Sequence, residues 1–154
     1  MITIHHLGVS QSDRIVWLME ELGLPCRLKW YPRSTAGLAP DAYLVLHPAG
    51  TAPVIEDDGL VLTESAVIVE HVCHRHAGGR FTVRPEQPNY SEHLYWMHFN
   101  NSILGLFFAR GALGTGGQGP RLETIRTLVD RREQRYFSYL NARLGVCGEL
   151  EFIA

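Results

Sequence analysis

The sequence of 154 residues contains few cysteines, only Cys26, Cys73 and Cys147, and they lie far apart along the chain. No C-x-x-C pair is present, so neither a dithiol redox motif nor a zinc knuckle is expected, and we predict three reduced thiols. The chain also has little excess charge, with a formal net charge of −2. Nucleic-acid binding usually requires a clustered basic face, so we expect no nucleic-acid partner.

Long hydrophobic runs are missing as well. No apolar stretch reaches the length that spans a membrane, so we expect no membrane partner. The chain starts with a strand-like Ile2-Thr3-Ile4 and without the basic start and apolar segment of a secretory signal, which predicts a cytoplasmic protein. With 45% apolar residues, the chain has enough hydrophobic side chains for one or two small domains.

The first half of the sequence alternates strand and helix patterns. Periodicity, glycines and prolines predict strands at 2–6, 27–31, 53–57 and 60–63, and helices at 12–22, 40–46 and 65–76. This order, βαβ followed by ββα, predicts an α/β thioredoxin-like domain with a mixed four-stranded sheet over residues 1–79.

The second half of the sequence has only helical patterns. Residues 80–88 are polar and contain two prolines, so we interpret them as a linker. Helices are predicted at 89–112 and 121–144, joined by a glycine-rich loop at 114–119. Residues 89–154 are therefore expected to form an all-α domain.

Residues 47–68 contain two features that together suit a small peptide ligand. Pro53 opens a strand, the Ala52-Pro53 bond is of the kind that can be cis, and Val54 can offer its backbone groups to an added extended peptide. Glu64 and Ser65 stand at a helix start, where the unpaired N–H groups and the hydroxyl favour a carboxylate and Glu64 suits an ammonium. Both features also have a purely structural interpretation. Pro53 could be an ordinary trans proline at a strand start, and Glu64-Ser65 could simply mark the start of a helix.

Residues 47–68 and residues 5–25 resemble the cis-proline strand, Glu-Ser helix start, first strand and active loop of cytosolic glutathione transferases of the serine type, bacterial or fungal-like. The resemblance implies glutathione as co-substrate, an apolar electrophile and a homodimer. It also implies that Val54 holds the cysteinyl part of glutathione. The glycine carboxylate of glutathione has a weaker expected partner, because Thr51 stands where a lysine is common in the family. His47 or Arg33 is expected to bind this carboxylate in place of the lysine.

The family ionises the thiol of glutathione through a hydrogen bond from a residue just after the first strand, and Ser10 matches that position. Ser12 is the reserve candidate. Both serines also suit a helix cap, and Ser10-x-x-Asp13 has the pattern of a capping box. One hydroxyl cannot fully serve both roles, so capping and catalysis compete for it.

Histidines and aromatic residues suggest further sites. His71, Cys73, His74 and His76 crowd one helix end, but a metal ion would need more ligands from elsewhere, so we expect solvated histidines and no metal. At least one of His5 and His6 is expected to be structural. The following aromatic residues are expected in a helical core, although the resemblance places their helix beside the second substrate and the dimer seam: Trp96, Phe99, Phe107 and Phe108.

The predicted function is attack of the glutathione thiolate on an electrophile. A non-catalytic binding or interaction module with the same fold is an alternative, because two helices form only part of the family's all-helical domain and Thr51 lacks a charge. A glutathione-dependent peroxidase or reductase is a third possibility, which a cysteine at position 10 would favour.

Overall fold

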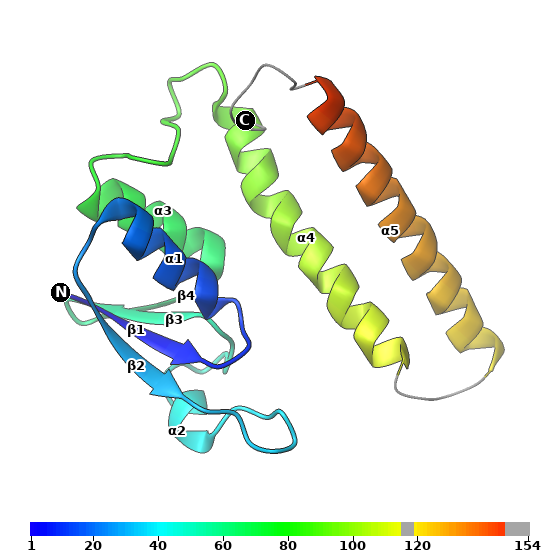
Figure 1. The fold of residues 1–154 in the computed structure, drawn as a ribbon, viewed down its shortest axis with the longest axis horizontal. Coiled ribbons are helices and arrows are strands. Elements are labelled where there is room, and N and C mark those ends of the chain that lie inside the picture. The colour runs from blue at the N-terminus through cyan, green and yellow to red at the C-terminus, as the bar shows by residue number, and fades with distance from the viewer. Residues whose placement is uncertain (115–118, 147–154) are drawn as a thin grey trace. The chain divides into compact units, whose positions relative to one another are not determined.

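The computed structural model describes residues 1–114 and 119–146, and Cys147 and most of the predicted glycine-rich loop lie outside them. The chain divides into two compact units, Met1–Arg84 and Pro85–Ala154, which are described separately (Figure 1). Cys26 and Cys73 are free thiols.

The first unit is a four-stranded mixed sheet with three helices. The strand order is β2-β1-β3-β4, with β1 parallel to β2 and antiparallel to β3, which is in turn antiparallel to β4. The predicted α/β thioredoxin-like fold is confirmed. The short helix predicted at 40–46 is only four residues long. The strands are β1 (Ile2–Leu7), β2 (Cys26–Tyr31), β3 (Val54–Asp57) and β4 (Leu60–Thr63), and the helices are α1 (Ser12–Leu22), α2 (Asp41–Leu44) and α3 (Ser65–His76).

The sheet packs its main core against α1 and α3. In α1, Ile15, Met19 and Leu22 recur at helical spacing and are all buried. The helix ends at Gly23, whose φ of 65° is a conformation that glycine adopts without strain, and whose N–H bonds to the carbonyl of Glu20. A second cluster joins α2 to the sheet through Leu7, Tyr31, Tyr43 and Val54. Both faces of the sheet are therefore covered, and in the central strands β1 and β3 every residue except Thr3 and Glu56 is buried.

His5 and His6 of β1 are both buried, so both are structural. The Nδ1 atom of His5 lies 3.0 Å from the Tyr31 hydroxyl, and its Nε2 atom lies 3.0 Å from Oε1 of Glu56. Burial lowers the pKa of His5, and it outweighs the opposing effect of Glu56. His5 is consequently held neutral inside the fold.

This burial predicts an acid-dependent loss of stability. The unfolded histidine has a pKa of about 6.5 and the folded one a lower pKa, so the stabilising contribution is complete above about pH 6.5 and is lost as the pH falls below it. We expect urea denaturation to show a steeper decline in unfolding free energy below about pH 6.5 for the wild type than for His5→Gln. Equal pH slopes for the two proteins would contradict the assignment.

The second unit is a pair of long helices, α4 (Tyr90–Gly114) and α5 (Pro120–Val146), close to the predicted bounds. Trp96 stacks on Tyr139 with ring centroids 5.7 Å apart, and Phe99 contacts Tyr136 at 5.0 Å. Arg143 pairs with Glu92 across the two helices. Trp96 and Phe99 therefore pack between α4 and α5 as expected of core residues.

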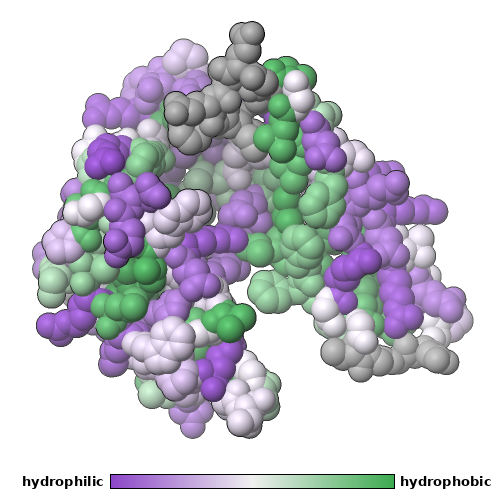
Figure 2. All heavy atoms as spheres, in the orientation of Figure 1, coloured by the Kyte–Doolittle hydropathy of each residue, from purple (hydrophilic) through white to green (hydrophobic). Residues whose placement is uncertain are grey.

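The two helices do not enclose a full core. Among the described residues of this unit only Val129 is buried, and Phe107 and Phe108 remain 46% and 69% exposed, contrary to a core role for them. Apolar side chains gather along α4, whereas the visible side of α5 is mainly hydrophilic (Figure 2). No helix in the described part of the chain combines the length and apolar character needed to cross a membrane.

Candidate functional site

Three loops of the first unit meet at one end of the sheet because of the strand directions. Strands β1 and β4 both run antiparallel to β3, so β1 and β4 end where β3 begins. The loop after β1, the segment before β3 and the junction of β4 with α3 therefore lie together, and they contain residues 8–11, 51–53 and 64–65. These are the segments that carry most of the site residues predicted from the sequence.

The segment before β3 has the predicted backbone conformation. The Ala52-Pro53 bond is cis, which confirms that expectation. Pro53 is buried, and Val54 begins β3 opposite His5 of β1 and Thr63 of β4. Thr51 is exposed and Ala52 is half-buried. The exposed surface of this segment is therefore provided by Thr51 and Ala52, whereas the side chain of Val54 is buried in the core and its backbone lies between β1 and β4.

Glu64 and Ser65 form the junction between β4 and α3. Glu64 is the residue before the helix, its side chain is exposed, and its φ of 69° is uncommon for a residue other than glycine. Its carbonyl accepts the N–H of Ile68, which forms the first turn of α3. Such backbone strain concentrates at binding sites, where it positions a side chain.

Ser65 is held by two residues from the start of the chain that the sequence analysis did not single out. Its hydroxyl donates to Oε1 of Gln11 at 3.2 Å and accepts from Nη1 of Arg14 at 3.4 Å. Ser65 is 4% exposed. Arg14 thus adds a positive charge beside the partial positive charge of the α3 N-terminus, and this combination favours a carboxylate. The sequence carries no signal for this pairing, because it joins residues 51 positions apart.

The two serines of the active loop lie on one hydrogen-bonded chain. The Ser10 hydroxyl donates to the Leu7 carbonyl at 2.6 Å and lies 2.7 Å from the Ser12 hydroxyl. The Ser12 hydroxyl in turn lies 2.8 Å from Nδ1 of His6. Ser12 is fully buried, whereas Ser10 is half-buried and forms the outer end of the chain.

The capping-box interpretation of Ser10 is wrong for this structure. The residue that caps α1 is Gln11, with no side-chain hydrogen bond at that position. The Ser10 hydroxyl instead accepts the N–H of Ser12 at 3.2 Å. Asp13, the other half of the expected box, places Oδ1 3.5 Å from Nε2 of His6. The hydroxyls thus organise the loop around His6, which was not a predicted site residue.

The residues expected near a glycine carboxylate differ in their surroundings. Arg33 uses its guanidinium to hold the active loop, donating to the carbonyls of Gly8 at 2.6 Å and Val9 at 3.2 Å. It also donates to the carbonyl of Gly37. His47 accepts the N–H of Ala49 through Nδ1, and its ring is half-buried. Arg33 therefore stabilises the backbone of the active loop, whereas the imidazole of His47 hydrogen-bonds within its own turn.

Comparison with known proteins identifies the family. Residues 10–75 match the family model described as the N-terminal domain of glutathione S-transferase. A curated relative, glutathione S-transferase 3 of Schizosaccharomyces pombe, is 39% identical over 104 residues, which are 68% of this chain and 43% of the relative. The chain belongs to the glutathione S-transferase family.

Solved structures of glutathione S-transferases share the fold of this chain. One from Actinobacillus pleuropneumoniae is 35% identical, with a TM-score of 0.79 over 94% of this chain and 66% of that one. Another, from Phanerochaete chrysosporium with oxidized glutathione, has a TM-score of 0.73 over 99% of this chain and 69% of that one, at 20% identity. The second likeness concerns the fold alone. This glutathione S-transferase chain spans less than half the length of its curated relative.

Proposed function

We propose that the first unit binds glutathione at the sheet end described above, and that the protein uses the glutathione thiolate to attack an apolar electrophile. The observation that carries the proposal is the position of Ser65. Its hydroxyl lies at the start of α3, within 3.4 Å of the Arg14 guanidinium and beside the exposed carboxylate of Glu64. An amino acid's carboxylate and ammonium are both matched there.

The γ-glutamyl end of glutathione carries that carboxylate and ammonium. The Ser65 hydroxyl turns from Gln11 to the ligand, so the carboxylate receives hydrogen bonds from this hydroxyl and from the first N–H groups of α3, in the field of Arg14. The ammonium pairs with Glu64. Because the backbone of Glu64 has a positive φ, its side chain points in a different direction from that of a residue with regular strand or helix dihedral angles.

The rest of the tripeptide lies along the segment before β3. The cysteinyl part pairs as an extended segment with the backbone of Ala52, before the cis bond, because Val54 already lies between β1 and β4. The glycine carboxylate then reaches Thr51 and His47. Thr51 provides one neutral hydrogen bond, so binding energy comes mainly from the γ-glutamyl end.

The cysteinyl sulfur faces Ser10 in this arrangement. The Ser10 hydroxyl turns from the Leu7 carbonyl to the sulfur. The Leu7 carbonyl keeps a hydrogen bond from the Ser12 hydroxyl, which lies 3.2 Å from it. A free thiol has a pKa of about 8.5, so a hydrogen bond to the thiolate increases the ionised fraction at neutral pH. The thiolate is the nucleophile, and holding it near the electrophile supplies the remaining rate enhancement.

Three further parts of the proposal concern the whole protein and rest on its family alone. They are a homodimer, a cytoplasmic location and an apolar electrophile bound with help from the all-α second domain. Turnover of an aromatic halide, compared with reduction of a peroxide, distinguishes a transferase from a glutathione peroxidase.

Removing the Ser65 hydroxyl is expected to weaken glutathione binding. A hydrogen bond to a charged group contributes about 1.5–3 kcal/mol, so Ser65→Ala should raise the Kd roughly 10- to 100-fold. Isothermal titration calorimetry of the full chain with glutathione measures this change. Ser138→Ala, on the exposed surface of α5, is the matched control and should leave the Kd unchanged.

Two results of this titration would contradict the proposal. Wild-type protein that does not bind glutathione contradicts the binding proposal and favours an interaction module with this fold. Equal affinities for the wild type and Ser65→Ala contradict the assigned orientation of the γ-glutamyl end.

A further inference from the structure

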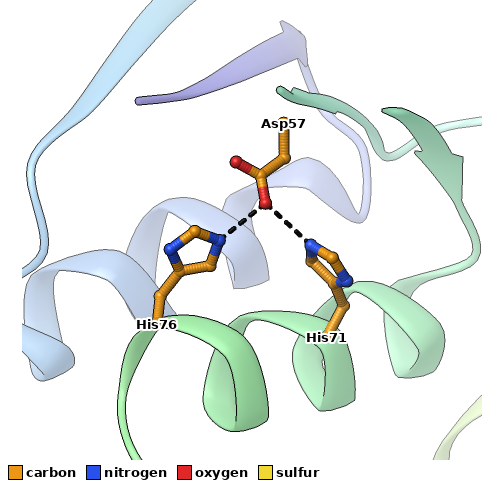
Figure 3. A group of neighbouring side chains, drawn as sticks. All are labelled: Asp57, His71 and His76. Carbon is orange, nitrogen blue, oxygen red and sulfur yellow. Dashed lines mark hydrogen bonds and ion pairs between the residues drawn. The ribbon is translucent and has the colours of Figure 1, made fainter. Parts of the chain in front are cut away.

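One carboxylate and two imidazoles converge at the end of the sheet opposite the proposed glutathione site. Asp57 is the last residue of β3, and His71 and His76 lie in the second half of α3. Both Nε2 atoms face the same carboxylate oxygen, Oδ2 of Asp57, at 2.8 Å from His71 and 2.6 Å from His76 (Figure 3). The glutathione site lies where β3 and α3 begin, so this cluster at their other ends is separate from it.

The cluster has a buried side and an open side. The side chains of Asp57, His71 and His76 are 9%, 16% and 33% exposed. A carboxylate with so little exposure needs strong partners, which the two imidazoles supply. The more exposed edge at His76 gives an ion a path from solvent. This differs from the solvated histidines expected from the sequence.

We propose that Asp57, His71 and His76 bind Zn²⁺ through Oδ2 and the two Nε2 atoms. The three ligand atoms all lie within 4.8 Å of one another. In a tetrahedral zinc site with bonds of about 2.0–2.2 Å, ligand atoms lie roughly 3.3 Å apart. The two short separations, 2.8 Å and 2.6 Å, therefore need to open by about 0.5 Å and about 0.7 Å, and water takes the fourth position.

The donor set selects the class of cation. Imidazole nitrogens suit zinc and its neighbours among the transition metals, whereas Ca²⁺ and Mg²⁺ prefer oxygen ligands. Each histidine that ligates through Nε2 carries its remaining proton on Nδ1. The ion then joins the end of β3 to the end of α3. Because these ligands come together only in the folded chain, zinc binding stabilises the fold.

Zinc titration of the chelator-treated full chain tests the proposal. We expect calorimetry to show one equivalent of Zn²⁺ whose affinity falls more than tenfold in His71→Ala and in His76→Ala. Loss of an outer hydrogen-bond partner of a zinc ligand already weakens binding by about 10–100-fold. Zn²⁺ should also raise the Tm of the wild type and leave the Tm of His76→Ala unchanged.

His74→Ala is the matched control, because His74 lies on the same helix but bonds to Glu70 at 3.0 Å, away from the cluster. It should bind Zn²⁺ like the wild type. Circular dichroism should show that His76→Ala folds, since His76 is the last residue of α3. The proposal is overturned if wild-type protein takes up no Zn²⁺, if both cluster variants keep full affinity, or if His74→Ala loses affinity equally.

Discussion

Ser10→Ala is expected to raise the pKa of the enzyme-bound glutathione thiol by about one to two units and to lower turnover at neutral pH about 10- to 100-fold. The size follows from a hydrogen bond to a charged group, worth about 1.5–3 kcal/mol, at about 1.36 kcal/mol per pKa unit. The Kd for glutathione should change little, because the γ-glutamyl end is held elsewhere. Thiolate absorbance of the bound glutathione as a function of pH measures the shift.

Ser12→Ala separates the two serines. Ser12 is fully buried and hydrogen-bonded to His6, so its removal should leave the thiol pKa nearer the wild-type value while costing about 1–3 kcal/mol of stability through the unpaired imidazole. A larger thiol shift in Ser12→Ala than in Ser10→Ala would reverse the assignment. If the thiol pKa is unchanged in both variants, neither serine stabilises the thiolate.

Ile55→Ala is expected to destabilise the first unit by about 2–5 kcal/mol. Ile55 is fully buried on the central strand β3, where it belongs to the core cluster formed with α1 and α3. Alanine leaves a cavity that neighbouring strands on both sides prevent from collapsing. Amide hydrogen exchange of β1 and β3 measures the free energy of opening for this unit separately from α4 and α5.

Val61→Ala provides the comparison on an exposed strand. Val61 lies on β4 and is 37% exposed, so its truncation should change the opening free energy by only about 0.5 kcal/mol. Similar losses in the two variants would show that the sheet does not form the stabilising core of the unit.

Local sequence signals determined most of the first unit. The periodicity of Ile15, Met19 and Leu22 with Gly23 after them specified α1, because a helix needs one apolar stripe and a stop. Asp58 and Gly59 have φ values of 49° and 83°, as a two-residue hairpin turn requires, and they join β3 to β4. The helix start at Ser65 was likewise predictable.

Burial in the second unit was less predictable. The helical pattern of α4 was correct, but Phe107 and Phe108 are exposed, because a helical repeat says which residues share a face and not whether another element covers it. Trp96, Phe99 and Phe107 each contact an aromatic ring of α5, but the contact of Phe107 with Phe137, at 6.4 Å between ring centroids, leaves Phe107 46% exposed.

The sequence by itself determined the family, the α/β thioredoxin-like fold and the segments that meet at the candidate site, because these depend on local patterns. Only the tertiary structure decided the partners of individual polar groups. It joined Arg14 to Ser65, assigned Arg33 to the loop backbone and brought Asp57 to His71 and His76. Such hydrogen bonds depend on the three-dimensional distance between residues far apart in sequence, which periodicity and turn signals do not contain.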